Sequence, residues 1–500
     1  MDERSKVSEA KDRPNILIIL TDQLRYDCLG AYGNHDVQTP VLDSLATDGI
    51  MYRNCFCTFP VCTPSRYSLL TGLYGHQHLG VNNHGTIPSG IDTFPRIAQN
   101  SGYTTKAVGK MHFTPTYLDV GFEHMILAEQ DGPGRYDDDY HRYLQKKGLV
   151  DRIDLIDQVN EYRNKAPEEY WRSFGAIESN LKEEHYSTTW IADRAVEAID
   201  EWDGGANLLM VGFIKPHHPF DPPAPWSQMY NPEKLSLLPG WTESCLPSDL
   251  ARKKGYFSNE ELTEAKLKKL MAYYYASISQ IDHHVGRMIH LLNKKGLYDD
   301  TLIVFTSDHG EYMGYHHLLL KQNFMYEPLV RVPLLIKYSG QVKGGTVSDD
   351  LVSTIDVTPT ILTQVGRERG VKMNGQDLSK DSTPRDFIFA QSTILELEDN
   401  REYMVRSRDY KLLLCENDND SRFFDLINDP FELNNLYKDL RYREVVEEYK
   451  RSLTNWILFE AAAKAHLHEN ALIISADNVL EVQGNHRQES AEYFRRLMQD

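Results

Sequence analysis

Residues 15–23 read Asn-Ile-Leu-Ile-Ile-Leu-Thr-Asp-Gln, a short apolar run that ends in polar side chains. Residues 208–214 and 302–306 have the same apolar texture, which is typical of parallel strands buried on both faces. Between residues 262 and 292, apolar side chains recur every three or four positions, which predicts a long amphipathic helix that stops before Gly296. Buried strands that alternate with helices predict an α/β fold, whose ligands bind beyond the carboxyl ends of the strands.

The length of the chain and a change in its composition predict more than one domain. Five hundred residues, 41% of them hydrophobic and 25% charged, are typical of a globular chain of two or three domains. From about Phe387 onward the apolar runs become shorter and the charge becomes denser. We therefore predict a large α/β domain over residues 1–382, and a smaller α+β domain with a helical tail over residues 383–500.

The charge balance argues against some partners. The chain carries 73 acidic and 54 basic side chains, a net charge of −19, which repels nucleic acid and anionic membrane surfaces at long range. No apolar run approaches the length of a membrane span, and residues 1–12 lack the apolar core of a secretory signal. We therefore expect a cytoplasmic protein with no nucleic-acid or membrane partner, although a secreted chain trimmed of its signal would look the same. An anionic substrate would need a local cationic pocket.

The cysteines are too few and too unevenly spread for a disulfide framework. They are Cys28, Cys55, Cys57, Cys62, Cys245 and Cys415. The pair Cys55-x-Cys57 suggests a thiolate metal site, but no further ligands cluster with it. Cys62 stands in a different context, because residues 62–66 read Cys-Thr-Pro-Ser-Arg and residues 67–72 read Tyr-Ser-Leu-Leu-Thr-Gly. Taken alone, a cysteine before a Thr-Pro-Ser turn could serve only packing or loop structure.

Residues 62–66 resemble the Cys-x-Pro-x-Arg signature of the type I sulfatases, which belong to the alkaline phosphatase superfamily. The resemblance implies that a formylglycine-generating enzyme oxidises Cys62 to formylglycine, an aldehyde that works as its hydrate. It also implies a sulfuric ester hydrolase with a large mixed sheet between helices and a smaller C-terminal α+β domain. The likeness covers most of the first 380 residues, and residues 425–436 are similar to the family's C-terminal motif.

Two predicted strands end in candidate metal ligands. Asp22 and Gln23 follow the first strand, and Asp308 and His309 follow a later one. An aspartate in such a position is usually a helix cap, but the resemblance implies that these residues hold a divalent cation together with the group derived from Cys62. The oxygen-rich ligand set favours calcium, with manganese, which the imidazole admits, or magnesium as alternatives.

Further motifs have counterparts in the family's own order. Residues 109–112 read Gly-Lys-Met-His, residues 215–220 read Lys-Pro-His-His-Pro-Phe, and Lys321 lies thirteen positions after Asp308. A single lysine is usually a solvated surface charge. The assignment of Lys110 and Lys321 therefore rests on the order and spacing of the motifs. The resemblance assigns catalysis to Cys62, Arg66, Lys110, His112, His217 and Lys321, and anion binding to Asn83. The remaining histidines near these motifs are interpreted as structural or peripheral; they are His218, His316 and His317.

The resemblance also implies a reaction sequence. The metal-activated formylglycine hydrate attacks sulfur, while Arg66 and Lys110 neutralise the diol. Such cations are needed because an anionic nucleophile about 4 Å from a sulfate ester meets repulsion of about 4 kcal/mol at an effective dielectric near 20. His217 and Lys321 bind the sulfate and protonate the leaving oxygen, and His112 then takes the proton that allows sulfate to be eliminated.

Two other functions are compatible with these motifs. Phosphonate monoester and phosphodiester hydrolases share the nucleophile and the metal site, but they usually depart from the family at Lys-x-His, which is intact here as Lys110 and His112. The second alternative is an anion-binding protein without catalytic activity. Retention of all the candidate groups argues against that alternative.

The sequence does not name the substrate, which is a small-molecule or saccharide sulfate ester. Residues 130–184 are rich in Asp, Tyr, Glu and Lys and form either a solvated surface element or a lid. Together with the C-terminal domain, this insertion is predicted to supply the pocket walls. In the tail, residues 461–500, the apolar residues 472–474 either pack on the chain's own core or join two chains in a homo-oligomer.

Overall fold

The computed structural model describes most of the chain. The described residues are 13–130, 136–252, 255, 257–321, 323–341, 344–367, 373–380, 383–393, 401–462 and 484–498. The tail residues Leu472, Ile473 and Ile474, and residues 381–382 at the predicted domain boundary, lie outside this set. The contacts of these tail residues, with the chain's own core or with a second chain, therefore stay predictions. The exact boundary between the two domains also stays a prediction.

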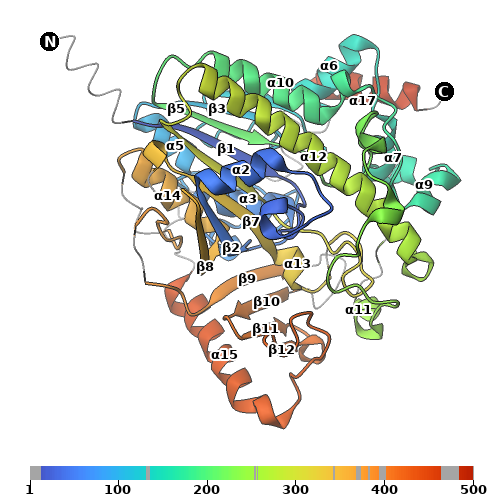
Figure 1. Cartoon of the computed structure of the whole chain (residues 1–500), viewed down its shortest axis with the longest axis vertical. Coiled ribbons are helices and arrows are strands. Elements are labelled where there is room, and N and C mark those ends of the chain that lie inside the picture. Colours follow the sequence, from blue (N-terminus) through green and yellow to red (C-terminus); the bar gives the residue numbers. More distant parts are fainter. Residues whose placement is uncertain are drawn as a thin grey trace.

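A large mixed sheet forms the centre of the molecule (Figure 1). Its strand order is β4-β3-β5-β1-β6-β7-β2-β8, and β7 alone of these strands runs antiparallel to its neighbours. The strands are β1 (Asn15–Thr21), β2 (Ile50–Phe56), β3 (Thr104–Gly109), β4 (His124–Leu127), β5 (Asn207–Gly212), β6 (Thr301–Ser307), β7 (Arg331–Lys337) and β8 (Thr346–Ser353). The apolar runs read from the sequence correspond to β1, β5 and β6, which confirms them as buried parallel strands.

Strand β1 is apolar throughout because both of its faces are buried. Ile16 and Ile18 lie in the hydrophobic core on one side of the sheet, and Leu17 and Ile19 lie in the core on the other side. Its parallel neighbours β5 and β6 place their own apolar side chains in the same two layers. Burial on both faces is what removes the polar and apolar alternation of a half-exposed strand.

Helices cover both faces of the sheet (Figure 1). The core on one face contains side chains of α2 (Pro40–Asp48), α10 (Ser187–Asp200) and α12 (Glu264–Lys294). The core on the other face contains side chains of α3 (Cys62–Thr71), α5 (Phe94–Asn100) and α14 (Val357–Gln364). The predicted long helix is α12, and Gly296 follows its end with a φ of 68°, a left-handed conformation that glycine adopts without strain. The shorter helices are α4 (Gly75–His78), α11 (Pro247–Arg252) and α13 (Glu327–Val330).

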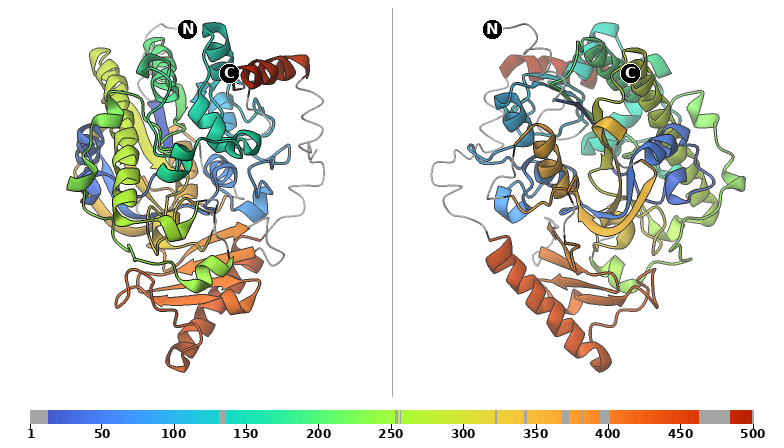
Figure 2. Two further views of the ribbon diagram at one scale, coloured as in Figure 1. Left: turned by 90° about the vertical axis from the view of Figure 1, so that its right-hand side faces the viewer. Right: turned by 60° about the vertical axis from the view of Figure 1, so that its left-hand side comes forward.

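The insertion at residues 130–184 is partly helical, and it packs against the core. Its described helices are α6 (Asp139–Lys147), α7 (Arg152–Gln158), α8 (Asn160–Arg163) and α9 (Glu168–Ser173). Leu144, Leu155 and Tyr170 are buried in the same core as α12. Helix α17 (Gly484–Leu497) lies against α6, where Phe494 stacks on Tyr136 at 5.3 Å between ring centroids (Figure 2). The insertion is therefore part of the packed structure and not only a solvated surface element.

A second, smaller sheet lies at one end of the molecule (Figure 2). It is antiparallel, with the order β12-β11-β10-β9. Its strands are β9 (Ile388–Thr393), β10 (Arg401–Arg406), β11 (Tyr410–Cys415) and β12 (Arg422–Asp425). One face continues the core of the large sheet, and the other packs against α15 (Arg443–Asn455). The predicted smaller α+β element is thus a sheet with one covering helix.

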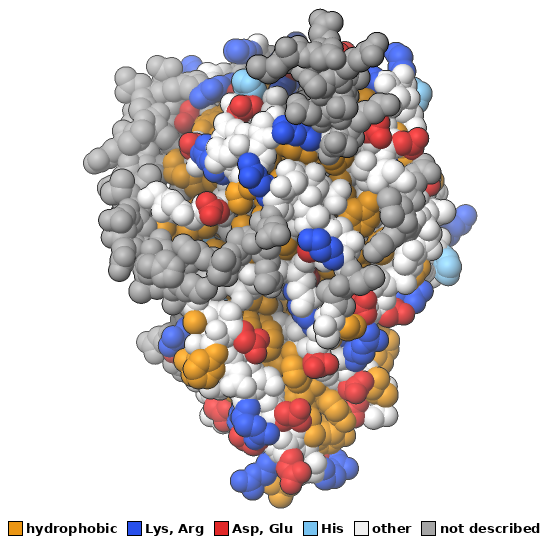
Figure 3. Space-filling view, turned by 90° about the vertical axis from the view of Figure 1, so that its left-hand side faces the viewer, with side chains coloured by type: hydrophobic (Ala, Val, Ile, Leu, Met, Phe, Trp, Pro, Cys, Tyr) orange, Lys and Arg blue, Asp and Glu red, His pale blue; other side chains and the backbone are white. Residues whose placement is uncertain are grey.

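The surface of this smaller part combines apolar and charged side chains. Figure 3 shows hydrophobic side chains gathered over the end of the molecule that holds the second sheet, with acidic and basic side chains interspersed. The large hydrophobic side chains exposed there are Ile427, Phe431, Leu433, Leu440, Leu458 and Phe459.

Among the described helices, none is long and apolar enough to cross a membrane.

A buried ion-pair network joins the two sheets. Glu327, at the start of α13, accepts hydrogen bonds at 3.3 Å from Arg406 of β10 and from Lys411 of β11. Lys411 also lies 2.8 Å from Glu432. Burial alone would raise the pKa of Glu327, but Arg406 and then Lys411 lower it to about 2. The ionised carboxylate is therefore the form that holds the second sheet in place.

Replacing Glu327 with glutamine is expected to lower the unfolding free energy by about 3–5 kcal/mol, because Arg406 and Lys411 would stay buried without their counter-charge. The stability that the carboxylate contributes is present above its unfolded pKa of about 4.5 and is lost as the pH falls toward 2, so the variant should lack that part of the acid dependence. Urea denaturation at pH 7 and pH 3 measures both effects. Glu416→Gln is the control, because its pair with Arg401 is exposed; an equal loss in both variants would contradict the prediction.

Candidate active site

The candidate metal ligands lie at the carboxyl ends of two neighbouring strands. Thr21 of β1 pairs with Ser307 of β6, so Asp22 and Asp308, the next residues, leave the sheet side by side. Asp22, Asp308, His309 and Cys62 each offer one ligand atom, and these atoms all lie within 4.8 Å of one another. All four residues are buried. The fold thus brings together residues that are up to 287 positions apart in the sequence.

Cys62 is the first residue of α3 and points into this cluster. Its Sγ lies 3.5 Å from Asp22 Oδ1, 3.3 Å from His309 Nε2 and 3.0 Å from Lys321 Nζ. The helix begins at Cys62 itself. Burial, followed by the charge of Asp22, raises the pKa of the Cys62 thiol to about 11. The unmodified side chain is therefore a neutral thiol at pH 7 and not an activated thiolate nucleophile.

The donors around Cys62 fit a divalent cation. His309 Nδ1 donates to the carbonyl oxygen of Gly310 at 2.9 Å, which leaves the lone pair of Nε2 facing Asp22 and Asp308. Gln23 donates through Nε2 to Glu311, and its buried Oε1 has no partner within the described part of the chain. An unpaired buried amide oxygen costs free energy unless a ligand satisfies it. Two carboxylates, an amide oxygen and an imidazole are therefore available to a metal.

Glu311 was not identified from the sequence, although it lies two positions after His309. Besides Gln23, its carboxylate accepts hydrogen bonds from the backbone N–H groups of Met313 and Leu320. These donors hold the carboxylate in one orientation, and the carboxylate binds the amide nitrogen of Gln23. Glu311 thus decides which atom of the Gln23 amide group is left for a ligand.

Replacing Glu311 with glutamine is expected to weaken divalent-cation affinity by about 10–100-fold. The new amide can keep its oxygen on the two backbone donors, but its nitrogen would then face Gln23 Nε2, so the Gln23 amide would turn and present N–H groups to the cation. Titration calorimetry with calcium and with manganese measures the affinity directly. Glu129→Gln is a matched control, because Glu129 is also buried and accepts backbone hydrogen bonds, from Met111 and His112. Unchanged affinity in Glu311→Gln would overturn this role.

Two buried cations lie next to the carboxylates. Arg66 Nε donates to Asp308 Oδ2 at 2.9 Å, and its Nη2 donates to Asp22 Oδ2 at 3.1 Å. Lys110 Nζ lies 2.8 Å from Asp22 Oδ2. Lys110 reaches this position because its backbone runs against Gly212, where an added Cβ would come within 2.0 Å of the Lys110 carbonyl oxygen. The sequence-predicted Arg66 and Lys110 are thus fixed charges inside the site.

His112 combines a held backbone with an unpaired ring. Its backbone N–H donates to Glu129, and its φ of 57° is unusual for a residue with a side chain. Both ring nitrogens are buried and have no hydrogen-bond partner among the residues that the structure describes. Burial, followed by Lys110, holds the pKa of His112 well below its usual range. The ring is therefore neutral at pH 7 and has a nitrogen free to accept a proton.

Lys321 and His217 form a second polar group next to Cys62. Lys321 Nζ lies 3.0 Å from His217 Nε2 and 3.2 Å from His309 Nε2. His217 Nδ1 lies 2.6 Å from the carbonyl oxygen of His218. A carbonyl oxygen can only accept a hydrogen bond, so the ring nitrogen must be the donor. The His217 proton is therefore on Nδ1, and Nε2 accepts from the Lys321 ammonium group.

The remaining predicted residues lie at the edge of the site or outside it. Asn83 Oδ1 accepts a hydrogen bond from the backbone N–H of Thr63 at 3.2 Å, so its contact with an anion stays a prediction. His316 Nε2 bonds to the carbonyl oxygen of Phe431, and both ring nitrogens of His317 bond to carbonyl oxygens. These contacts agree with the structural role expected of His316 and His317. None of the six cysteines, all of which lie in the described part of the chain, forms a disulfide bond.

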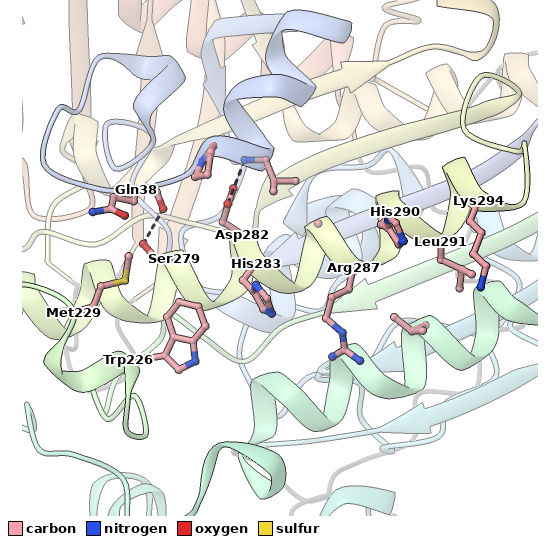
Figure 4. Close-up of a pocket in the computed structure, with 14 residues that line it drawn as sticks. Gln38, Trp226, Met229, Ser279, Asp282, His283, Arg287, His290, Leu291 and Lys294 are labelled. Carbon is pink, nitrogen blue, oxygen red and sulfur yellow. Dashed lines mark hydrogen bonds between the residues drawn. The ribbon is translucent and has the colours of Figure 1, made fainter.

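A groove of about 620 Å³ lies elsewhere, along α12 (Figure 4). Trp226, His283, Arg287 and Lys294 line it together with residues of α2 and α10. None of the residues that surround Cys62 lines this groove. This groove therefore does not mark the candidate site, which is a small polar cluster at the strand ends.

Solved structures with a similar fold are known. The structure resembles the crystal structure of a phosphonate monoester hydrolase of Agrobacterium radiobacter with a TM-score of 0.73, at 23% sequence identity over 89% of this chain and 95% of that chain. Similarity at this identity establishes the fold alone. The predicted architecture, a large mixed sheet between helices with a smaller C-terminal sheet, is therefore confirmed.

The family follows from the sequence comparisons. A family model described as sulfatase matches residues 14–367, and a model of the C-terminal part of N-sulphoglucosamine sulphohydrolase matches residues 314–457. An arylsulfatase of Clostridium perfringens is 31% identical over 88% of this chain and 94% of its own length. An N-acetylglucosamine-6-O-sulfatase of Bacteroides thetaiotaomicron is 28% identical over 89% of this chain and 86% of its own length. The chain belongs to the sulfatase family and is a sulfuric ester hydrolase, as its motifs predicted.

Proposed function

We propose that the protein removes sulfate from a sulfated saccharide, using a nucleophile derived from Cys62. The observation that carries the proposal is the position of Cys62 at the start of α3, between the metal-ligand cluster and the Lys321 ammonium group. The saccharide is inferred from the similarity to an N-acetylglucosamine-6-O-sulfatase and to the C-terminal part of N-sulphoglucosamine sulphohydrolase. A sugar hydroxyl is a poor leaving group, so its release calls for a proton donor at the leaving oxygen.

Charge neutralisation is the first requirement of the reaction. Arg66, Lys110 and Lys321 surround the position of the nucleophile, and Arg66 and Lys110 are buried and held by carboxylates. Fixed cations in a buried site stabilise developing negative charge without having to reorient. They also offset the repulsion between a sulfate ester and an anionic nucleophile.

Two groups that the family uses would complete the site. A divalent cation held by Asp22, Gln23, Asp308 and His309 would act as a Lewis acid. Formylglycine at position 62, installed by a formylglycine-generating enzyme, would supply the attacking hydroxyl group. The three oxygen-donating residues favour calcium, and the single imidazole makes manganese the main alternative.

Proton transfer is assigned to two different groups of the site. Lys321 donates to His217 Nε2 in the resting site and is placed to give a proton to the leaving oxygen as the sulfur–oxygen bond breaks. His217 holds the ammonium group in position. His112, with its neutral and unpaired ring, is placed to take the proton whose loss releases sulfate. This assignment makes Lys321 the acid and His112 the base.

The proposal is tested on chain co-expressed with a formylglycine-generating enzyme and loaded with calcium. Mass spectrometry of the tryptic peptide 54–66 first establishes conversion of Cys62. Release of sulfate from N-acetylglucosamine 6-sulfate is then compared with hydrolysis of 4-nitrophenyl sulfate and of a phenyl phosphonate monoester. Faster turnover of the sugar sulfate supports the proposal. A preference for the phosphonate would reassign the enzyme, and a fully converted, metal-loaded chain without any turnover would indicate an anion-binding protein.

A further inference from the structure

A residue of the insertion reaches the active site through a buried hydrogen bond to a histidine. Asp157, near the end of α7, lies 2.5 Å through Oδ2 from His218 Nδ1. Its other oxygen, Oδ1, accepts a hydrogen bond from the Tyr170 hydroxyl at 2.8 Å. Asp157 is fully buried and His218 is 8% exposed. A helix that is remote in sequence thus fixes the residue next to His217.

His218 controls His217 in two ways. The two rings stack, with centroids 4.2 Å apart and an interplanar angle of 25°. The backbone carbonyl of His218 also accepts the His217 Nδ1 proton at 2.6 Å, and the same carbonyl accepts from Gln130 Nε2 at 2.9 Å and from Gln158 Nε2 at 3.2 Å. Gln130 and Gln158 both belong to the insertion. The tautomer and the plane of the His217 ring are therefore set by groups that the insertion holds.

The series of contacts from Asp157 through His218 and His217 continues to Cys62. His217 Nε2 accepts from Lys321 Nζ at 3.0 Å, and Lys321 Nζ lies 3.0 Å from Cys62 Sγ. Burial alone would raise the pKa of Asp157, but His218 outweighs burial and lowers it, so the carboxylate is ionised. A rotation of His218 would tilt the ring stacked on it and move the acceptor that holds the Lys321 ammonium group. The effect would be greatest on the step in which Lys321 protonates the leaving oxygen.

We propose that Asp157 and His218 are positioning residues for protonation of the leaving group, through which the insertion controls catalysis on esters of poorly acidic alcohols. The proposal rests on the proposed function, because it assumes that Lys321 protonates the leaving oxygen. Breaking the sulfur–oxygen bond leaves an electron pair on that oxygen. A nitrophenolate leaving group carries this charge unaided, whereas a sugar or alkyl oxygen needs the Lys321 proton.

The test compares Asp157→Asn with the wild type on a series of sulfate esters whose leaving groups range from 4-nitrophenol to phenol and N-acetylglucosamine. Asparagine keeps the shape but removes the charge. We expect less than a 2-fold loss of kcat on 4-nitrophenyl sulfate and about a 100-fold loss on the sugar sulfate. The control is Asp138→Asn, because Asp138 forms a similar buried pair with His141 at 2.7 Å within the same insertion. Asp138→Asn should show no dependence on the leaving group.

The outcomes separate the inference from the proposed function. If the wild type hydrolyses no sulfate ester, the proposed function fails. If the wild type is active but Asp157→Asn loses the same fraction of kcat on every ester, the pair is merely structural and the inference is overturned. Thermal unfolding of each variant shows whether it folds. Should Asp157→Asn not fold, His218→Phe keeps the ring stack and the backbone carbonyl while removing the pair, and the same leaving-group dependence is then required of it.

Discussion

Replacing Cys62 with alanine is expected to abolish sulfate-ester hydrolysis, with a loss of at least about 10⁴-fold in kcat. Alanine cannot be converted to formylglycine, so the position that Cys62 Sγ occupies, 3.0 Å from Lys321 Nζ and 3.5 Å from Asp22 Oδ1, would lose its nucleophile. The measurement is sulfate release from N-acetylglucosamine 6-sulfate and from 4-nitrophenyl sulfate under multiple turnover. The alanine variant should still bind the divalent cation, because four other donors remain.

Two further variants sharpen this result. Cys57→Ala removes another buried thiol close in sequence and should leave turnover unchanged. Cys62→Ser retains one hydroxyl group, so it should accept sulfate once, detectable as an added mass on the peptide, but should not release it. Multiple turnover by Cys62→Ser at the wild-type rate would show that the reaction does not need the second hydroxyl group of a formylglycine hydrate.

Replacing Lys321 with alanine is expected to lower kcat on the sugar sulfate by about 10²–10⁴-fold, the range typical of a general acid. Lys321 Nζ lies about equally far from Cys62 Sγ, His217 Nε2 and His309 Nε2, at 3.0, 3.0 and 3.2 Å, so its loss removes both a proton donor and a charge. The loss should be smaller on 4-nitrophenyl sulfate, whose leaving group needs no proton. Initial rates on the two substrates give the comparison.

The control for this prediction is Lys268→Ala. Lys268 lies on α12 and pairs with Glu264 at the surface, so its removal should leave kcat unchanged on both esters. Equal losses on both esters in Lys321→Ala would indicate that the ammonium group only binds the sulfate. The proton would then have to come from another group, and the assignment of Lys321 as the acid would be withdrawn.

The sequence could predict the large sheet and most of the site because the signals are local. The apolar run of β1 ends where Asp22 begins, and the run of β6 ends just before Asp308. In a sheet of parallel strands, residues that follow neighbouring strands lie at the same edge, so these ligands had to meet. The resemblance around Cys62 then assigned Lys110, His217 and Lys321 to the same place, and the structure brings them there.

The sequence alone decided which chemical groups the protein carries: the convertible Cys62, the ligand pairs and the cations. Only the tertiary structure decided how those groups are held. Glu311, 288 positions away, binds the amide nitrogen of Gln23 and so leaves the amide oxygen for a ligand. His217 has its proton on Nδ1 because His218, which pairs with Asp157 from 61 positions away, presents a carbonyl oxygen to it. No local pattern marks Asp157, since an aspartate in a short helix is usually solvated. Burial, tautomer and pKa depend on which distant groups exclude water from a side chain, and that is settled only when the chain packs.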